Sequence, residues 1–135
     1  MLKWGDEHSL NISLIDEQHK KLFELINRTR IVVSSNLIDA LETLDQIIEY
    51  SREHFEIEEY FMKMCNFPEL ESHRNEHFDF ANTIVDYKNR VVCGDYQVIN
   101  EILGYIVGWV DNHIQVTDRE YIDCFKKYGI NPMSP

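Results

Sequence analysis

Residues 70–87 read LESHRNEHFDFANTIVDY. Apolar residues recur in this segment at steps of three and four, which is the spacing of a helix that buries one face. His73 and His77 occupy two positions of that face. Because residues four apart on a helix lie one turn above the other, the segment predicts a core-facing helix that presents two imidazoles side by side.

Three further segments repeat this apolar pattern before and after residues 70–87. They cover residues 16–33, with Asp16 as the expected N-cap, residues 37–65, and residues 99–113. Breaks fall at Ser34-Ser35-Asn36, Asn66-Phe67-Pro68 and Cys93-Gly94-Asp95. Four helices with short connections pack as antiparallel neighbours. The sequence therefore predicts an all-α fold, an up-down-up-down antiparallel four-helix bundle in one domain (residues 1–135), with a non-helical arm over the first fifteen residues and a short tail after Tyr121.

Five of the six histidines and two carboxylates fall on the apolar faces of these helices. The set consists of His19, His54, Glu58, His73, His77, His113 and Asp118. Antiparallel connectivity brings the starts of the first and third helices to the ends of the second and fourth, so we expect the set to meet at one level of the core. Each pair alone is typical of an ordinary helix surface. Together, buried without a ligand, these groups would destabilise the fold, and we predict a dinuclear metal centre.

The composition of the set matches two octahedral ions. Five imidazoles, two bridging carboxylates and one bridging oxide or hydroxide supply about eleven of the twelve bonds needed, which leaves one position for a small ligand. The spacing of His113 and Asp118 is less favourable, because five residues of α-helix turn about 500° and separate the side chains by about 140°. We therefore expect Asp118 to reach around the helix, or the helix to be overwound or bulged there.

Composition excludes several classes of partner. The chain has 24 acidic and 13 basic residues and a net charge of −11, which disfavours nucleic acid and anionic membranes. The longest apolar stretch, residues 102–110, contains two glycines and is too short to cross a bilayer. Three widely spaced cysteines without a C-x-x-C pair, together with an N-terminus that lacks an apolar segment, predict a reducing, cytoplasmic location.

These motifs resemble the hemerythrin family, specifically its single-domain bacterial members. The resemblance rests on Trp4, the segment Ile15-Asp16-Glu17-Gln18-His19, His54-Phe55 with Glu58-Glu59, His73-x-x-x-His77, and Trp109 before His113-Ile114 and Asp118. It implies that His73, His77 and His113 hold a six-coordinate iron. It also implies that His19 and His54 hold a five-coordinate iron, that Glu58 and Asp118 bridge the two, and that a bridging oxo or hydroxo group completes the di-iron cofactor.

The residues beside the ligands have expected roles of their own. Phe55, Trp109 and Ile114 are predicted to line the pocket at the open coordination position, although each could equally be an ordinary core side chain. Tyr121 could hydrogen-bond a ligand or fill the end of the bundle. Gln115 is expected on the surface, and His8 outside the site.

The resemblance implies a non-haem di-iron protein that binds dioxygen reversibly for carriage, storage or delivery, and that is not an enzyme. Two alternatives use the same site. One is an oxygen sensor that signals to a separate partner protein, and the other is a di-iron enzyme of the peroxidase or nitric-oxide reductase type. No histidine has a glutamate three residues before it, which argues against the repeated Glu-x-x-His motif of ferritin-like oxidases.

Overall fold

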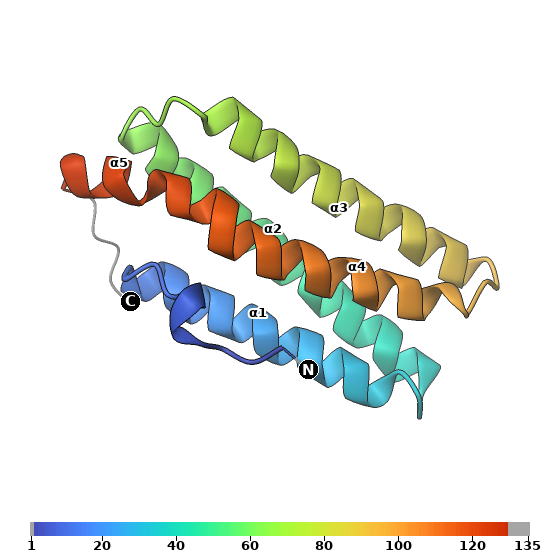
Figure 1. Cartoon of the computed structure of the whole chain (residues 1–135). Helices are drawn as coiled ribbons and strands as arrows, with labels where there is room; N and C mark the ends of the chain where they lie inside the picture. Colours follow the sequence, from blue (N-terminus) through green and yellow to red (C-terminus); the bar gives the residue numbers. More distant parts are fainter. Residues whose placement is uncertain (1, 130–135) are drawn as a thin grey trace.

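A computed structural model of the chain describes residues 2–129. Four long helices run alternately up and down: α1 (Ser13–Val32), α2 (Leu37–Met64), α3 (Leu70–Val92) and α4 (Val98–Asn112). Figure 1 shows α1 beginning, α2 ending and α3 beginning at the same end of the bundle, where α4 continues into the C-terminal segment. Residues 2–129 contain no strand. The predicted all-α, antiparallel four-helix bundle is confirmed.

The connections follow from residues that favour helix ends. Asn36 is the N-cap of α2, and its side-chain oxygen accepts hydrogen bonds from the backbone N–H groups of Ile38 and Asp39. After α2, Asn66 adopts a positive φ of 55°, and after α3, Gly94 adopts a φ of 109°. Asparagine tolerates this left-handed region and glycine enters it without steric cost, so each helix stops there and the chain reverses.

The predicted start of the first helix was wrong. α1 begins at Ser13 with Ile12 as its N-cap, and Asp16 lies inside its first turn. The Asp16 carboxylate instead accepts hydrogen bonds from the Ser9 hydroxyl at 2.7 Å and from the backbone N–H of Leu10 at 2.9 Å. It thus holds the preceding arm against the helix. The arm itself contains a short 3₁₀ helix, η1 (Asp6–His8), so it is not wholly irregular.

The predicted short tail was also incomplete. A π-helical turn, η2 (His113–Thr117), follows α4 directly, and a 3₁₀ turn, η3 (Asp118–Tyr121), leads into α5 (Ile122–Lys127). Phe125 of α5 is fully buried, and its ring stacks on that of Tyr121 with 4.5 Å between centroids. Burial of these aromatic rings explains why the chain stays helical past the predicted end. The last part of the predicted tail, residues 130–135, lies outside the described residues.

Two apolar clusters fill the interior, one on each side of the histidine level. The larger cluster runs along the bundle and includes Phe55 and Ile114. The smaller one closes the end of the bundle and includes Met62, Tyr121 and Phe125. Along α2, Glu58 therefore lies between an aromatic residue of the first cluster and a methionine of the second. The polar groups of the site are enclosed by apolar side chains, which lowers the local dielectric constant and strengthens electrostatic interactions there.

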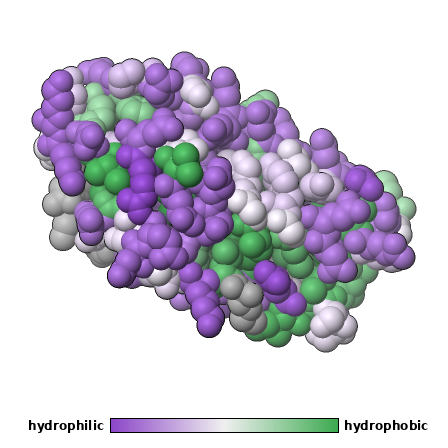
Figure 2. All heavy atoms as spheres, in the orientation of Figure 1, coloured by the Kyte–Doolittle hydropathy of each residue, from purple (hydrophilic) through white to green (hydrophobic). Residues whose placement is uncertain are grey.

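One face of the bundle is mostly hydrophilic (Figure 2). Figure 2 shows charged and polar side chains over most of one face, with a hydrophobic area over the seam between α1 and α4. A shallow pocket at this seam is lined by Val33, Leu103 and Val107, among others. Within residues 2–129, none of the helices combines the length and apolarity required to span a membrane.

Candidate metal centre

The structure brings all seven of the side chains selected from the sequence to one level of the bundle. They form two overlapping groups in which potential ligand atoms lie within 4.8 Å of one another. One group contains His73, His77, His113, Glu58 and Asp118, and the other contains His19, His54 and the same two carboxylates. All seven residues are buried, with relative exposures of 4% or less. Two histidine sets that share two carboxylates have the layout of a dinuclear centre.

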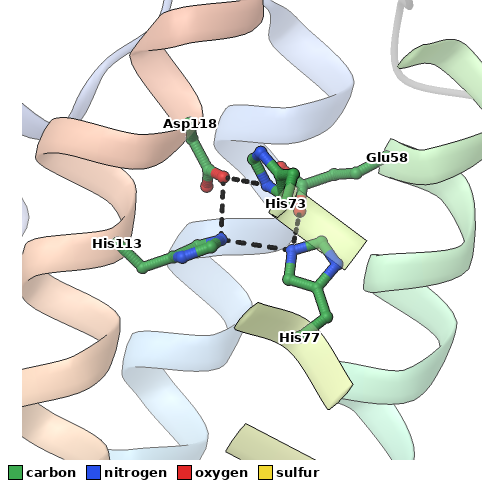
Figure 3. A group of neighbouring side chains, drawn as sticks. All are labelled: Glu58, His73, His77, His113 and Asp118. Atoms are coloured by element: carbon green, nitrogen blue, oxygen red, sulfur yellow. Dashed lines mark hydrogen bonds and ion pairs between the residues drawn. The ribbon is translucent and has the colours of Figure 1, made fainter. Parts of the chain in front are cut away.

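The three-histidine group combines side chains from α2, α3 and the two turns after α4, η2 and η3 (Figure 3). The Nε2 atoms of His73 and His113 each lie 3.0 Å from Oδ1 of Asp118. The Nε2 atom of His77 lies 3.4 Å from Oε1 of Glu58 and 3.1 Å from Nε2 of His113. The same nitrogen of each ring therefore points into the common space.

The two-histidine group completes the other side. Nε2 of His19 lies 3.2 Å from Oδ2 of Asp118, and Nε2 of His54 lies 3.2 Å from Oε1 of Glu58. Asp118 thus directs one oxygen toward each histidine group. Glu58 approaches His54 and His77 through Oε1, while its Oε2 lies 4.0 Å from Nε2 of His19. Each carboxylate is positioned to interact with both groups, as a bridging ligand must be.

The π-turn explains how Asp118 reaches this space. The backbone N–H of Asp118 donates to the carbonyl of His113, five residues earlier, which is the hydrogen bond of a π-turn. Widening the helix in this way brings residues five apart toward the same face. The helix is therefore locally bulged, one of the outcomes expected from the unfavourable spacing of His113 and Asp118. Ile114 and His113 stay buried through the turn.

The outer nitrogens of three rings are held by polar groups from other positions. Nδ1 of His54 lies 2.6 Å from Oε1 of Gln18, and Nδ1 of His77 lies 2.8 Å from Oε2 of Glu59. Nδ1 of His113 lies 3.2 Å from Oε2 of Glu76. At His54 and His77 the contact is a hydrogen bond to an oxygen acceptor, which requires Nδ1 to carry the proton, so in a neutral ring Nε2 keeps its lone pair for a metal.

The electrostatics of the site favour ionised carboxylates. Burial and the neighbouring Asp118 act to raise the pKa of Glu58, but its contacts with His54 and His77 outweigh them and lower the pKa well below its usual range. Burial likewise acts to raise the pKa of Asp118, and contacts with His113, His19 and His73 lower it well below normal. Burial acts to lower the pKa of His77, while contacts with Glu58 and Glu59 raise it overall to about 9. Cations, whether protons or metal ions, are therefore strongly attracted to this space.

The protein by itself does not satisfy the polar atoms at the centre. Among the described residues, buried atoms without a hydrogen-bond partner include both ring nitrogens of His19, Nε2 of His73, Oε1 of Glu58 and both carboxylate oxygens of Asp118. Several lie within 3.0–3.2 Å of another polar atom, yet their directions do not form hydrogen bonds. Metal ligands have this arrangement, in which the polar atoms lie close together and point toward a common centre without forming hydrogen bonds to one another. Imidazole and carboxylate donors suit iron, so the residues fit a di-iron centre.

Tyr121 supplies one further contact to the site. Its hydroxyl donates a 2.6 Å hydrogen bond to Oε2 of Glu58, and the residue is fully buried. Of the two roles considered for Tyr121 from the sequence, both are realised, because the ring also packs in the cluster that closes the bundle. The hydrogen bond leaves Oε1 of Glu58 directed toward His54 and His77.

A small cavity of about 10 Å³ adjoins both histidine groups. Its wall contains the three residues selected as pocket lining, Phe55, Trp109 and Ile114. It also contains four members of the site, His19, His54, His113 and Asp118. The ring of Trp109 stacks on His113 at 4.1 Å, and Ile114 is 2% exposed. The cavity has room for about one molecule the size of water, and its wall is largely apolar apart from the histidines and Asp118.

Sequence reasoning missed the residues that hold the outer nitrogens. Gln18, Glu59 and Glu76 each stand directly beside a member of the histidine and carboxylate set in sequence. Glu76 shows why this signal is insufficient, because it precedes His77 but contacts His113. These partners depend on how neighbouring helices are rotated, which spacing along one helix does not report.

Gln115 is partly exposed and lies outside the cluster of seven, which agrees with the predicted position at the edge of the bundle. Its amide donates to Oδ1 of Asp111 at 3.0 Å. His8 lies outside the cluster of seven, as expected, but it is 3% exposed and its Nε2 lies 2.8 Å from Oδ1 of Asp111. The N-terminal arm is thereby tied to α4 two residues before His113.

Comparison with known proteins gives one consistent result. The family model described as "Hemerythrin HHE cation binding domain" matches residues 10–125. The chain is 33% identical over 129 residues to a bacteriohemerythrin of Clostridium acetobutylicum, covering 91% of this chain and all of that protein. It is 28% identical to a bacteriohemerythrin of Stenotrophomonas maltophilia, covering 95% of this chain and 84% of that protein. A myohemerythrin of Theromyzon tessulatum is 29% identical over 119 residues, or 88% of this chain and 89% of that protein.

The fold agrees with solved structures of the same group. A crystal structure of wild-type hemerythrin superposes with a TM-score of 0.86 at 25% sequence identity. The superposition covers 92% of this chain and 97% of the other. Sequence and fold therefore point to the same family over nearly the whole chain.

Proposed function

The chain belongs to the hemerythrin family, and from this premise we propose that it binds dioxygen reversibly at a non-haem di-iron centre in the core of its bundle. The observation that carries the proposal is the pair of histidine groups that share two buried, ionised carboxylates. The unpartnered polar atoms at their centre support it, because a bound cation would give those atoms a favourable interaction in an apolar core.

We propose His73, His77 and His113 as ligands of one iron and His19 and His54 as ligands of the other, with Glu58 and Asp118 bridging. The two-histidine group has one ring fewer, so an iron held there would have room for a small ligand, and His19 and His54 of this group line the small cavity. When bound, the iron pair supplies two electrons and one vacant coordination position for a diatomic ligand. Every other part of the function depends on the protein around it.

The protein contributes orientation and exclusion of water. Gln18, Glu59 and Glu76 hold the rings of His54, His77 and His113 with Nε2 inward. Phe55, Trp109 and Ile114 form an apolar wall at the cavity. A cavity of about 10 Å³ admits only a very small ligand, which agrees with binding of a diatomic molecule such as dioxygen.

An optical titration tests the proposal. Protein loaded with two irons per chain and reduced without oxygen is expected to be nearly colourless. Oxygen should produce a visible absorption band, and purging with argon should remove the band with the ferrous iron retained. Metal analysis that finds one metal per chain, or mainly zinc, would contradict the proposal, as would a band that forms once and cannot be reversed.

Two other roles for the same site make different predictions. An enzyme of the peroxidase or nitric-oxide reductase type would consume peroxide or nitric oxide steadily with a reductant, whereas an oxygen carrier would not. A sensor would transmit its state to a separate partner protein. The family relatives favour oxygen binding over both.

We further propose a cytoplasmic location, supported by the free thiols of Cys65, Cys93 and Cys124.

Replacing Ile114 with Ala should accelerate oxidation of the oxygenated protein. The side chain is buried beside the small cavity, and its loss opens space through which water and anions reach the centre. We expect unchanged iron content and a decay to the oxidised form about tenfold faster or more, which corresponds to about 1.4 kcal/mol in the barrier. Stopped-flow absorbance with and without azide measures the rate, and azide should increase it further.

Ile99→Ala is the matched control for this variant. Ile99 is also buried in the larger apolar cluster, but it lies in the first turn of α4, at the opposite end of that helix from His113. The substitution should lower stability without changing the oxidation rate. Loss of iron from Ile114→Ala would show that Ile114 holds His113 in place. An unchanged oxidation rate would show that Ile114 does not exclude water, and Trp109 would then be the next residue to test.

A further inference from the structure

A second cavity lies between α2 and α3, outside the seven-residue cluster. Its volume is about 220 Å³. Most of its wall is apolar and comes from Ile48, Phe80, Ala81, Ile84 and Val85. The pocket is open to solvent on one side, where Ala81 and Val85 are exposed. An enclosed cavity of about 150 Å³ accommodates benzene, so the volume here is large enough for a substituted ring or a branched chain of similar size.

One polar atom of the wall has no partner. Ser51, in the middle of α2, lines this cavity and is 3% exposed, and its hydroxyl makes no hydrogen bond within the part of the chain that the structure describes. A serine inside a helix commonly donates to the carbonyl four residues earlier, and Ser51 does not. A buried hydroxyl without a partner destabilises a fold, so a polar group supplied from outside would form a favourable hydrogen bond with it.

The charged residues at the rim balance one another. Arg74 is held by two carboxylates, Glu59 at 3.1 Å and Glu71 at 2.7 Å. Arg52 lies 3.7 Å from Glu49, and Glu56 adds a further negative charge to the lining. With both arginines paired and a net charge of −11 on the chain, the rim offers little attraction to an anion. A cation is also disfavoured, because the apolar wall offers no negative group to pair with its charge.

We propose that this cavity binds a small uncharged amphipathic molecule, of the phenol or short branched alcohol class. Its apolar part packs on Ile48, Phe80 and Ile84. The Ser51 hydroxyl is covered in this structure, so its side chain rotates toward the cavity to form a hydrogen bond with the hydroxyl of the bound molecule. Phe55 lines both this cavity and the small one beside His19 and His54, so the bound molecule contacts the residue that separates the two. The ring of Phe55 also stacks on His77 at 3.8 Å, nearly parallel at 6°.

Calorimetric titration of the iron-loaded protein with phenol and with toluene tests the proposal. The two probes have nearly the same size, and only phenol has a hydroxyl. Ser51→Ala should weaken phenol binding about tenfold and leave toluene binding unchanged within about twofold, because it removes one hydrogen bond and retains the apolar wall. Ala81→Phe, at an exposed position of the wall, should abolish binding of both probes by filling the cavity.

Two further measurements make the result decisive. Ser72→Ala, an exposed serine on α3, should leave both affinities unchanged. Ser51→Ala should not lower the melting temperature, because the hydroxyl it removes has no partner. The proposal is overturned if phenol does not bind at millimolar concentration, if Ser51→Ala weakens both probes equally, or if that variant melts lower and thereby shows that Ser51 has an internal partner.

Discussion

Iron-free protein will melt about 10 °C or more below the iron-loaded protein. A ligand that binds only the folded state at a thousandfold excess over its dissociation constant stabilises it by about 4 kcal/mol. In a domain of this length, each kcal/mol shifts the melting temperature by about 3–4 °C. Removal of the metal also leaves buried nitrogen and oxygen atoms without partners, including those of His19 and Asp118. Differential scanning calorimetry before and after chelation measures the shift.

The loss of stability should be concentrated near the site. Amide hydrogen exchange should become faster in iron-free protein at residues 54–58 of α2 and at residues 113–118, which contain the π-turn. The far end of α3, residues 84–92, packs in the larger apolar cluster and serves as an internal control. Reloading with ferrous iron should restore both the melting temperature and the protection. Equal melting curves with and without metal would show that the bundle does not depend on its centre.

Glu58→Gln will reduce the iron content from two per chain to one or fewer. An amide has a single acceptor oxygen and a donor NH₂ group, so it cannot bridge two cations as a carboxylate can. The volume is nearly unchanged, and the Tyr121 hydroxyl can still donate to the amide oxygen, so the bundle is retained. We expect affinity for the second iron to fall more than about a hundredfold, the upper end of what removing an outer partner costs. Elemental analysis and circular dichroism measure both properties.

Two glutamates of the same helix provide matched controls. Glu53→Gln changes an exposed carboxylate and should leave two irons per chain. Glu59→Gln changes the acceptor at Nδ1 of His77 and should weaken binding by about 10–100-fold without changing the stoichiometry at saturation. If Glu58→Gln still binds two irons tightly, Glu58 is not a bridging ligand, and Asp118 alone connects the two histidine groups.

Periodicity along single helices predicted most of the bundle and of the candidate site. His73 and His77, or His54 and Glu58, share a helix face because they are four residues apart, and this relation holds whatever surrounds the helix. Their faces are also the apolar faces, so the hydrophobic packing that forms the bundle brings the same side chains together. Polar breaks such as Ser34-Ser35-Asn36 marked the helix ends for equally local reasons.

Other features depend on interactions between segments that are distant in the sequence. Asp16 has the residue type of an N-cap, but Ser9 and Leu10 of the arm donate to its carboxylate. α5 forms because Phe125 packs in an apolar cluster that includes residues of α2 and of the N-terminal arm. Neither result follows from the sequence around Asp16 or Phe125, since each depends on where another part of the chain packs.

The sequence by itself determined that the chain forms four amphipathic helices and that five histidines and two carboxylates face their common core. Only the tertiary structure decided that a π-turn aligns Asp118 with His113, that Gln18 and Glu59 orient two of the rings, and that Ser51 lies in the wall of a second cavity without a hydrogen-bond partner. The physical reason is one of range. Side-chain direction along a helix is set by 3.6 residues per turn, whereas contacts between helices depend on the rotation and offset of every helix, which all the packed side chains determine together.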